Sequence, residues 1–219
     1  MFKHLLSVFL ESQCAFCQRS TSSDILCQYC FQKLSSYQLS NEDRHQLYQA
    51  QSTFAWGKYD GLLKRAIAQM KYNRKPEIGN ELGTLLGQTW LDHQSVRVKS
   101  KITVVPIPMH QNKQQERGFN QAQTIAKSFC QVTGHKLNTQ ALVRIRETEA
   151  MFNLGTSAER IKNLEGALQI GTKLPRYPVW LIDDIHTTGT TVKEAIKVLQ
   201  QNNIKVVGVA VAAKAGSFK

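Results

Sequence analysis

The segment Val179 to Thr191, VWLIDDIHTTGTT, constrains the fold more than any other stretch of the chain. It joins four apolar residues to two adjacent acids and then to a loop rich in threonine and glycine. A short apolar run of this kind is typical of a strand buried on both faces of a parallel sheet. Such a strand would deliver Asp183 and Asp184 to the carboxyl edge of the sheet, where the ligands of open α/β sheets bind.

The surrounding segments alternate between strand and helix patterns. KITVVPIP and IKVVGVAVAAK are expected to be strands, whereas residues 61–75, 119–132 and 191–201 have helical patterns. Pro76 ends the first of these helices, and EIGNELGTLLGQTWL predicts another that its glycines loosen. Residues 147–164 are polar and show no clear period. This order predicts an α/β fold, with a mainly parallel sheet flanked by helices.

A cysteine cluster marks the beginning of the chain. Two CxxC pairs separated by nine residues supply the four thiolates that a tetrahedral zinc ion needs. Disulfides and a redox CxxC are the alternatives, but no export signal is evident and a redox site needs a single pair. Four thiolates leave no open coordination position, so the predicted zinc is structural. The proposed ligands are Cys14, Cys17, Cys27 and Cys30. We therefore expect a zinc module with its linker at 1–50, followed by one α/β domain at 51–219.

The loop HTTGTT after the two acids has the composition of an anion-binding turn. Gly189 permits backbone conformations that a side chain would forbid, and successive N–H groups at a helix start attract phosphate. The two carboxylates can accept hydrogen bonds from the vicinal hydroxyls of a sugar. The alternative is an ordinary N-cap, but one cap accounts for one residue only. The layout fits a ribose 5-phosphate.

The segment Val179 to Thr191 resembles the phosphoribosyl pyrophosphate (PRPP) motif of type I phosphoribosyltransferases. VVPIP, RGFNQAQTIA, GLLKRAIAQMKY, RIRETEAMFNLGTSAERIKNLEGAL and the four-cysteine module extend the resemblance over nearly the whole chain, to the ComF family. ComF proteins are phosphoribosyltransferase-like and are linked to DNA uptake in naturally competent bacteria. The resemblance therefore implies a phosphoribosyltransferase-like domain behind the zinc module.

The resemblance also implies roles for individual residues. Asp183 and Asp184 would hold the ribose hydroxyls, residues 106–108 would form the pyrophosphate loop, and residues 144–160 would close over PRPP. Mg²⁺ would accompany PRPP, bound mainly through the ligand's own oxygens. The chain departs from the family pattern at Met151 and His186. The implied phosphate-loop residues are Thr187, Thr188, Gly189, Thr190 and Thr191, the pyrophosphate-loop residues are Pro106, Ile107 and Pro108, and the cations for the leaving group are Arg144, Arg146, Arg160 and Lys71.

The net charge of +12 and a pI near 9.6 favour anionic partners. Our first hypothesis is a PRPP-binding phosphoribosyltransferase-like protein that handles incoming single-stranded DNA, with an unknown acceptor. The second is a non-catalytic DNA-binding adaptor, supported by the basic clusters KYNRK and RVKSK and by Tyr59 and Tyr72, which can stack on bases. A nucleotide-salvage enzyme ranks third. Competence proteins such as a helicase are the implied partners.

No apolar run in the sequence approaches the length that a membrane span needs. The amino-terminal stretch MFKHLLSVFLES has only a short apolar core and no small-residue cleavage site, so we expect it to be a docking helix. The expected location is the cytoplasm.

Overall fold

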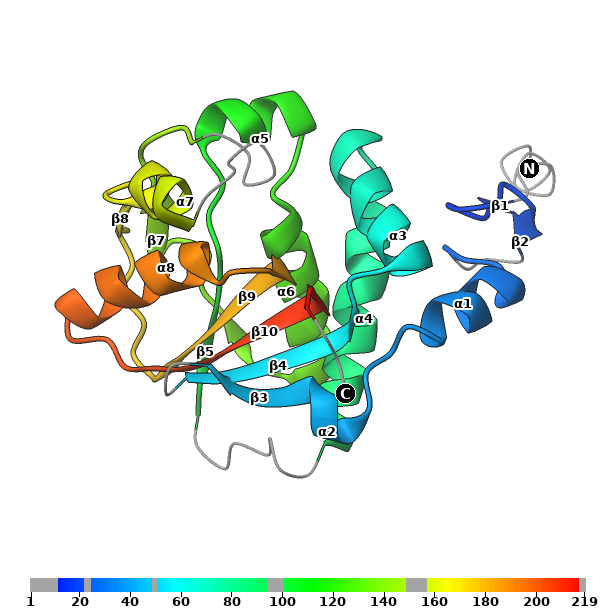
Figure 1. Ribbon diagram of the computed structural model, residues 1–219, viewed down its shortest axis with the longest axis horizontal. Helices are drawn as coiled ribbons and strands as arrows, with labels where there is room; N and C mark the ends of the chain where they lie inside the picture. The colour runs from blue at the N-terminus through cyan, green and yellow to red at the C-terminus, as the bar shows by residue number, and fades with distance from the viewer. Residues whose placement is uncertain (1–11, 22–24, 49–50, 94–100, 149–156, 217–219) are drawn as a thin grey trace, which may run out of the picture.

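The structure is a computed structural model that describes residues 12–21, 25–48, 51–93, 101–148 and 157–216. Its centre is a six-stranded sheet in the order β3-β4-β10-β9-β5-β6 (Figure 1). Every pairing is parallel except that of β3 with β4 at one edge. The predicted α/β class, a mainly parallel sheet flanked by helices, is therefore confirmed. The strands are β3 (His45–Tyr48), β4 (Gln51–Lys58), β5 (Thr103–Pro106), β6 (Lys136–Leu137), β9 (Val179–His186) and β10 (Val206–Lys214).

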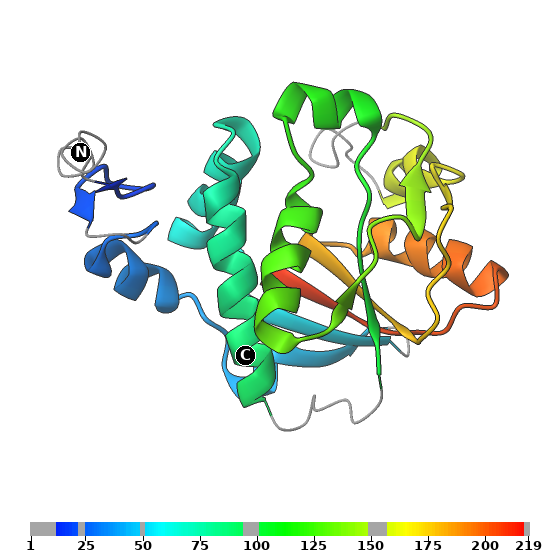
Figure 2. The same cartoon turned by 180° about the vertical axis from the view of Figure 1, so that it is seen from behind.

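Two apolar layers cover the two faces of this sheet. Helices α3 (Gly61–Tyr72), α4 (Pro76–Asp92) and α6 (Gln121–Thr133) pack on one face, and α8 (Thr190–Gln201) packs on the other (Figures 1 and 2). Strand β9 supplies both layers in alternation, because successive side chains of a strand point to opposite faces. Trp180 and Ile182 lie in the core with α4 and α6, whereas Val179 and Leu181 lie in the core with α8.

The glycines of α4 do not loosen this helix, contrary to the expectation from the sequence. They allow it to lie close against α6. A Cβ atom added at Gly83 would lie 2.3 Å from the carbonyl oxygen of Ile125, and one at Gly87 would lie 2.9 Å from the Val132 side chain. Pro76 occupies the first turn of α4, where its missing N–H costs nothing, so it begins this helix as well as following α3.

The amino-terminal module packs against the main body. It contains the short strands β1 (Ser12–Gln13) and β2 (Ser20–Thr21), and it continues into α1 (Gln28–Ser35). Its buried residues Ala15, Leu26 and Leu34 belong to the same apolar cluster as those of α3 and α4. Lys75, at the start of α4, donates a hydrogen bond of 2.9 Å from Nζ to the Ala15 carbonyl. The module thus shares its core with the helices beside it.

Several elements were not expected from the sequence. Residues 31–52, which are polar and were expected to form a linker with one helical turn, contain the end of α1, helix α2 (Asn41–Arg44) and strand β3. The region 147–164 contains α7 (Ser157–Leu164), and α5 (Gln111–Arg117) precedes α6. The short strand that the segment ALVRIR predicts is β7 (Leu142–Arg144), and it pairs antiparallel with β8 (Leu168–Ile170) beside α8 (Figure 1). Strand β3 lies before residue 50, yet it pairs with β4 in the main sheet. The division of the chain into two parts at residue 50 therefore stays a prediction.

No helix in the described ranges is both long enough and apolar enough to cross a membrane. The segment MFKHLLSVFLES lies almost entirely outside these ranges, as do Met151 and most of the cluster RVKSK.

Candidate functional site

The two acids of β9 lie at the carboxyl edge of the sheet but on opposite faces. Strand β9 continues regularly through both residues to His186, so the alternation of its side chains also continues. Asp184 points into the layer formed by α3 and α6, where it contacts Lys71 and Gln121. Asp183 lies on the α8 face, in a hollow lined by residues 185–192. The two carboxyl groups nevertheless share a side-chain hydrogen bond, so their titrations are linked.

Asp184 belongs to a buried polar chain that crosses two helices. Its carboxylate is ion-paired with the ammonium group of Lys71, and it accepts a hydrogen bond of 3.5 Å from Nε2 of Gln121. Gln121 in turn accepts a hydrogen bond of 2.6 Å from Nη1 of Arg117. Asp184 is 4% exposed. We expected Lys71 to contact a leaving group and Asp184 to hold the sugar. The structure instead pairs these two side chains with each other.

The environment separates the pKa values of the two carboxyls. Burial raises the pKa of Asp183 well above its ordinary value, and the nearby charge of Asp184 raises it further. Burial would also raise the pKa of Asp184, but the Lys71 ammonium group outweighs burial and lowers it. Burial opposes the charge on Lys71, yet Asp184 raises the lysine pKa on balance. At neutral pH Asp184 and Lys71 are charged, and Asp183 is the acid that holds a proton more readily.

The threonine-rich loop forms the other wall of the hollow beside Asp183. Gly189 has φ of 69° and is the N-cap residue of α8, so this position has no side chain to cap the helix. The hollow encloses only about 20 Å³. An anion would sit at its mouth, against the helix N-terminus, because a space of this size holds about one water molecule.

Residues 106–108 lie next to β9 but offer no free N–H group. Pro106 and Pro108 have none, and the N–H of Ile107 donates to the Ile182 carbonyl at 2.9 Å. The Ile107 carbonyl accepts a hydrogen bond of 3.1 Å from Asn120. This segment fixes the end of β5 and shapes the edge of the site.

The predicted arginines lie in different surroundings. Arg144 lies on β7, where burial lowers its pKa and the charge of Asp183 partly restores it. Its Nη2 donates to Thr148 at 2.9 Å, while its Nε is buried with no hydrogen-bond partner among the described residues. Arg146 instead donates to the carbonyls of Asn163 and Glu165, at the end of α7. Arg160 lies on α7, and its side chain is outside the described part of the structure.

The four cysteines of the two CxxC pairs meet at one point. Their Sγ atoms all lie within 4.8 Å of one another, which is a geometry able to bind a metal ion. Burial alone would raise the pKa of Cys14, but hydrogen bonds from the backbone N–H groups of Cys27, Cys17 and Phe16 lower it to about 6. These donors favour a thiolate, the form that binds metal. In the described ranges no second group of three or more metal-ligating side chains comes together.

Sequence reasoning missed Gln121 as a site residue. It stands in RGFNQAQTIA, which carried part of the family resemblance without an assigned role. Asn120 explains the position of its neighbour, because its side chain accepts hydrogen bonds from Ala122 and Gln123 and so begins α6 at Gln121. The sequence signal for this residue was the pair Asn120–Gln121 at the start of a helix. Only the packing of α6 on β9 shows that Gln121 reaches Asp184.

The parallel sheet, the two acids at its carboxyl edge and the threonine-glycine turn before α8 are the features that the resemblance to phosphoribosyltransferase-like proteins predicts. Comparison with known proteins adds relatives of this chain. Competence protein F of Haemophilus influenzae is 25% identical over 209 residues, which cover 93% of this chain and 91% of that protein. Competence protein ComFC of Bacillus subtilis is 25% identical over 189 residues, covering 85% of this chain and 70% of that protein. These relatives, which are similar over most of the chain, support the predicted resemblance to the ComF family.

A further relative carries a different name. The DNA utilization protein YhgH of Salmonella typhimurium is 27% identical over 152 residues, 69% of this chain. The match spans 66% of the Salmonella protein, just under two thirds of its length. No protein-family model matches the sequence.

Proposed function

We propose that the protein binds PRPP at the carboxyl edge of the sheet and acts in the use or uptake of DNA. One observation carries the ligand: Asp183, the buried Nε of Arg144 and the start of α8 behind Gly189 all belong to the α8 side of the sheet. An acid suits the sugar hydroxyls, a helix N-terminus suits the 5′-phosphate, and a partnerless guanidinium N–H suits a pyrophosphate oxygen.

In this arrangement the predicted site residues divide by role. Asp183 and residues 187–191 contact the ligand, whereas Asp184 and Lys71 position the strand end and the helix beside it. Arg146 supports α7 instead of meeting pyrophosphate. Mg²⁺ would neutralise the pyrophosphate through the ligand's own oxygens and water, with little help from the chain.

Isothermal titration with PRPP and Mg²⁺ tests the ligand. Wild type is expected to bind, and Asp183→Asn and Arg144→Gln are each expected to weaken binding by about tenfold or more, the cost of losing a charged hydrogen bond. Asp92→Asn, which removes an exposed acid at the end of α4, is the matched control and should bind like wild type. Absence of binding by wild type, or equal binding by Asp183→Asn, would contradict the proposal.

The role in DNA use or uptake is drawn from the names of the relatives. Competence and DNA utilization are the words in the names of these three relatives. Deletion of the gene in its own organism, with transformation frequency and growth on DNA as readouts, tests that role. Complementation with the Asp183→Asn variant would then show whether ligand binding is needed.

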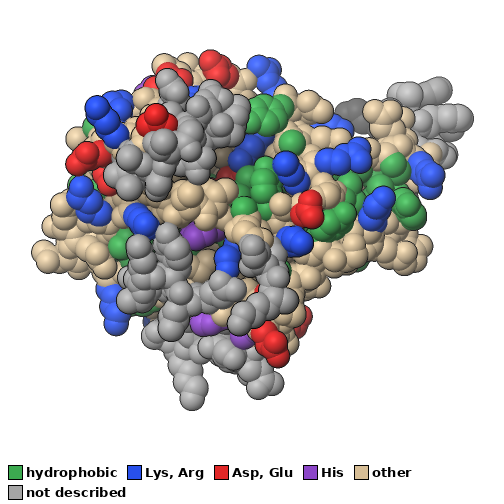
Figure 3. Space-filling view, viewed as in Figure 1, with side chains coloured by type: hydrophobic (Ala, Val, Ile, Leu, Met, Phe, Trp, Pro, Cys, Tyr) green, Lys and Arg blue, Asp and Glu red, His purple; other side chains and the backbone are tan. Residues whose placement is uncertain are grey.

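A non-catalytic DNA-binding adaptor is the second candidate, and the site itself favours it. Lys71 is paired with Asp184 and Arg146 holds carbonyls, so two of the four predicted leaving-group cations are already occupied. Tyr72 is 64% exposed and has the Arg117 guanidinium 6.0 Å from its ring centre, an arrangement suited to stacking on a base. On the face drawn in Figure 3, the visible Lys and Arg side chains are spread over the molecule, the amino-terminal module included.

A gel-shift titration with single-stranded DNA tests whether the protein is a DNA-binding adaptor. Binding should weaken steeply as salt rises, and Tyr72→Ala should weaken it more than Tyr72→Phe. Binding that does not change with salt concentration would contradict the adaptor hypothesis. Tyr59 is a poorer candidate than Tyr72, because it is partly buried against the core.

We also infer that the metal at Cys14, Cys17, Cys27 and Cys30 is zinc, in a structural role. Four thiolates around one point match the tetrahedral preference of Zn²⁺ and leave no position for a substrate. The module with its linker, residues 1–50, and the sheet domain, residues 51–219, would then be one folded body joined through α1. Metal analysis of the purified protein tests this assignment, with one equivalent of zinc expected.

A further inference from the structure

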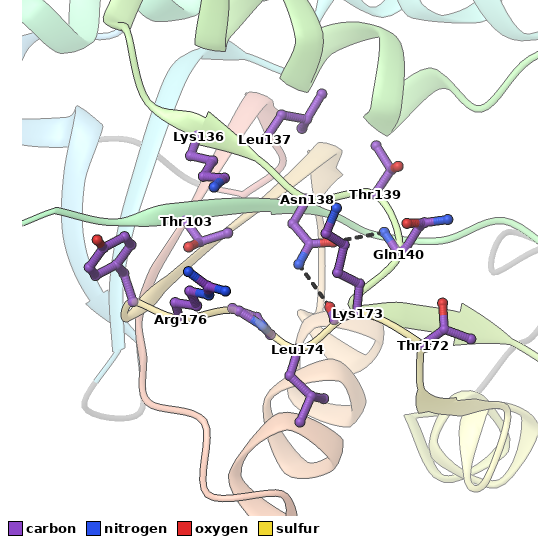
Figure 4. A pocket seen from close by; sticks show the side chains of 12 residues that line it. Thr103, Lys136, Leu137, Asn138, Thr139, Gln140, Thr172, Lys173, Leu174 and Arg176 are labelled. Carbon is purple, nitrogen blue, oxygen red and sulfur yellow. Dashed lines mark hydrogen bonds between the residues drawn. The ribbon is translucent and has the colours of Figure 1, made fainter.

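The largest of the described cavities lies at the opposite end of the sheet from the site above. It has a volume of about 580 Å³, within the range of sites that bind nucleotide-sized ligands. Its floor is Thr103, the first residue of β5, and its walls are residues 136–140 and 172–177 (Figure 4). Strand β9 begins just beyond Tyr177 and ends at His186, so roughly 25 Å of strand separates this cavity from the threonine loop.

The charged side chains that line the cavity are all positive. Lys136, Lys173 and Arg176 line the cavity, and none of the twelve described residues around it is acidic. None of these three cations is ion-paired with an acid of the described ranges. Figure 4 shows Lys136 and Arg176 on either side of Thr103, each from a different wall. Cations that converge on a cavity from two walls, without an acid to neutralise them, attract a phosphate group.

The two walls are already fixed to one another. Asn138 donates a hydrogen bond of 2.8 Å to the Lys173 carbonyl and accepts one of 3.0 Å from the Gln140 N–H (Figure 4). The Lys173 N–H returns a hydrogen bond of 3.2 Å to the Gln140 carbonyl. At Gly171 a Cβ would lie 2.0 Å from the Gln140 carbonyl oxygen, so the walls touch at their base. A ligand would meet a cleft whose shape is set before binding.

Apolar and aromatic surface lies beside the cations. Leu174 is 56% exposed and Tyr177 is 38% exposed, and both line the cavity. The Nζ of Lys101 lies 5.9 Å from the centre of the Tyr177 ring, which adds a fourth cation at the rim. Phosphate-binding cations next to exposed apolar side chains suit a ligand with an anionic end and a flat, less polar end. A bare phosphate would leave the apolar part of the lining unused.

We propose that this cavity, which we call the amino-edge cleft, binds a nucleoside phosphate. The phosphate would lie between Lys136, Lys173 and Arg176, and the base would lie against Leu174 and Tyr177. The same chemistry occurs in a free mononucleotide and in one unit of a single strand. This inference does not rest on PRPP binding at the carboxyl edge, since the two sites share no residue.

The test measures fluorescence anisotropy of a short fluorescein-labelled oligothymidylate on the full-length protein. Lys173→Gln/Arg176→Gln is compared with Lys127→Gln/Lys197→Gln, which removes the same charge from exposed positions on α6 and α8. The cleft variant should bind about tenfold more weakly than the control variant. Its slope of log affinity against log salt should fall by about one for each cation removed. Circular dichroism of both variants checks that they are folded.

Competition distinguishes the two sources of the ligand. Displacement of the label by thymidine 5′-monophosphate, but not by the same concentration of inorganic phosphate, would support a free nucleotide. Displacement only by unlabelled oligothymidylate would support a strand. Equal weakening in the cleft and control variants, or no binding by wild type, would overturn the proposal, because the charge of the whole protein would then suffice or no site would exist.

Discussion

The ammonium group of Lys71, in the last turn of α3, is ion-paired with the carboxylate of Asp184 on β9. Both side chains are largely withdrawn from water, at 18% and 5% exposed. A buried pair of this kind is costly to break from one side, because the remaining charge keeps its desolvation penalty without its partner.

Lys71→Met is therefore expected to lower the free energy of unfolding at pH 7 by about 3–5 kcal/mol. Lys71→Met/Asp184→Asn should recover a large part of that loss, because it leaves no unpaired buried charge. Urea unfolding of the three proteins measures both effects. Equal stability of wild type and Lys71→Met would show that the pair is not buried as described.

The pH dependence of this pair has a defined sign. The folded-state pKa of Asp184 is lowered, so the contribution of the pair is present above about pH 4 and is lost as pH falls through the lowered value. The pKa of Lys71 is raised, so the contribution is complete below about pH 10 and is lost as pH rises beyond that. The stability gap between wild type and Lys71→Met should therefore persist across neutral pH and close under strongly acidic conditions.

Asp183 has the opposite behaviour. Its folded-state pKa is raised, so the folded protein binds more protons there than the unfolded chain, and ionisation costs stability as pH rises above about 4. Asp183→Asn should be more stable than wild type at pH 7, because the neutral amide removes the unfavourable burial of a charge at this position. Thermal unfolding at pH 4 and pH 7 measures this. A variant that is less stable than wild type at pH 7 would contradict the burial of this acid.

The cysteine cluster makes a separate prediction. Cys14→Ser should lose the bound zinc and unfold at lower temperature, because the four thiolates act together. Cys130→Ser is the matched control, since Cys130 lies on α6 outside the cluster, and it should keep one equivalent of metal. Metal content by mass spectrometry, with and without a chelator, gives the answer. Full zinc retention by Cys14→Ser would remove this residue from the ligand set.

The contact between α4 and α6 predicts a graded series of substitutions. Gly83→Ala should destabilise by about 1–3 kcal/mol, because its Cβ would meet backbone of α6 that cannot move aside. Gly79→Ala should cost less, since its new methyl group would meet the ends of the Met70 and Thr124 side chains instead of backbone. An alanine at an unhindered helix position would instead stabilise by up to about 1 kcal/mol. A gain of stability in Gly83→Ala would refute the close approach.

The sequence was sufficient for the class of fold, because strand and helix periods alternate clearly from β4 to β10. It also placed both aspartates at the correct edge of the sheet. It could not show that they face opposite layers, because that depends on β9 continuing as a regular strand to His186, two residues beyond the acids. If β9 had ended at Ile182, the side chains of Asp183 and Asp184 could both have pointed toward the same face of the sheet.

Other features of the site depend on contacts between distant parts of the chain. Lys71 and Asp184 are more than a hundred positions apart, and no local pattern reports that they meet. The glycines of α4 have the same spacing in a loose helix as in one packed against a neighbour, so only the position of α6 decides between the two. Helix α7 was missed although Ala158, Ile161 and Leu164 recur at helical spacing, because the helix has only eight residues and its surroundings are polar.

The hydrogen bond from Lys75 to the Ala15 carbonyl ties the cysteine cluster to the turn that follows Lys71. Ala15 lies between Cys14 and Cys17, so the cysteine cluster is joined to the start of α4 both by this hydrogen bond and by the apolar core that the module shares with α3 and α4. A metal bound at the cysteines would therefore stabilise the packing of these helices as well as the module itself.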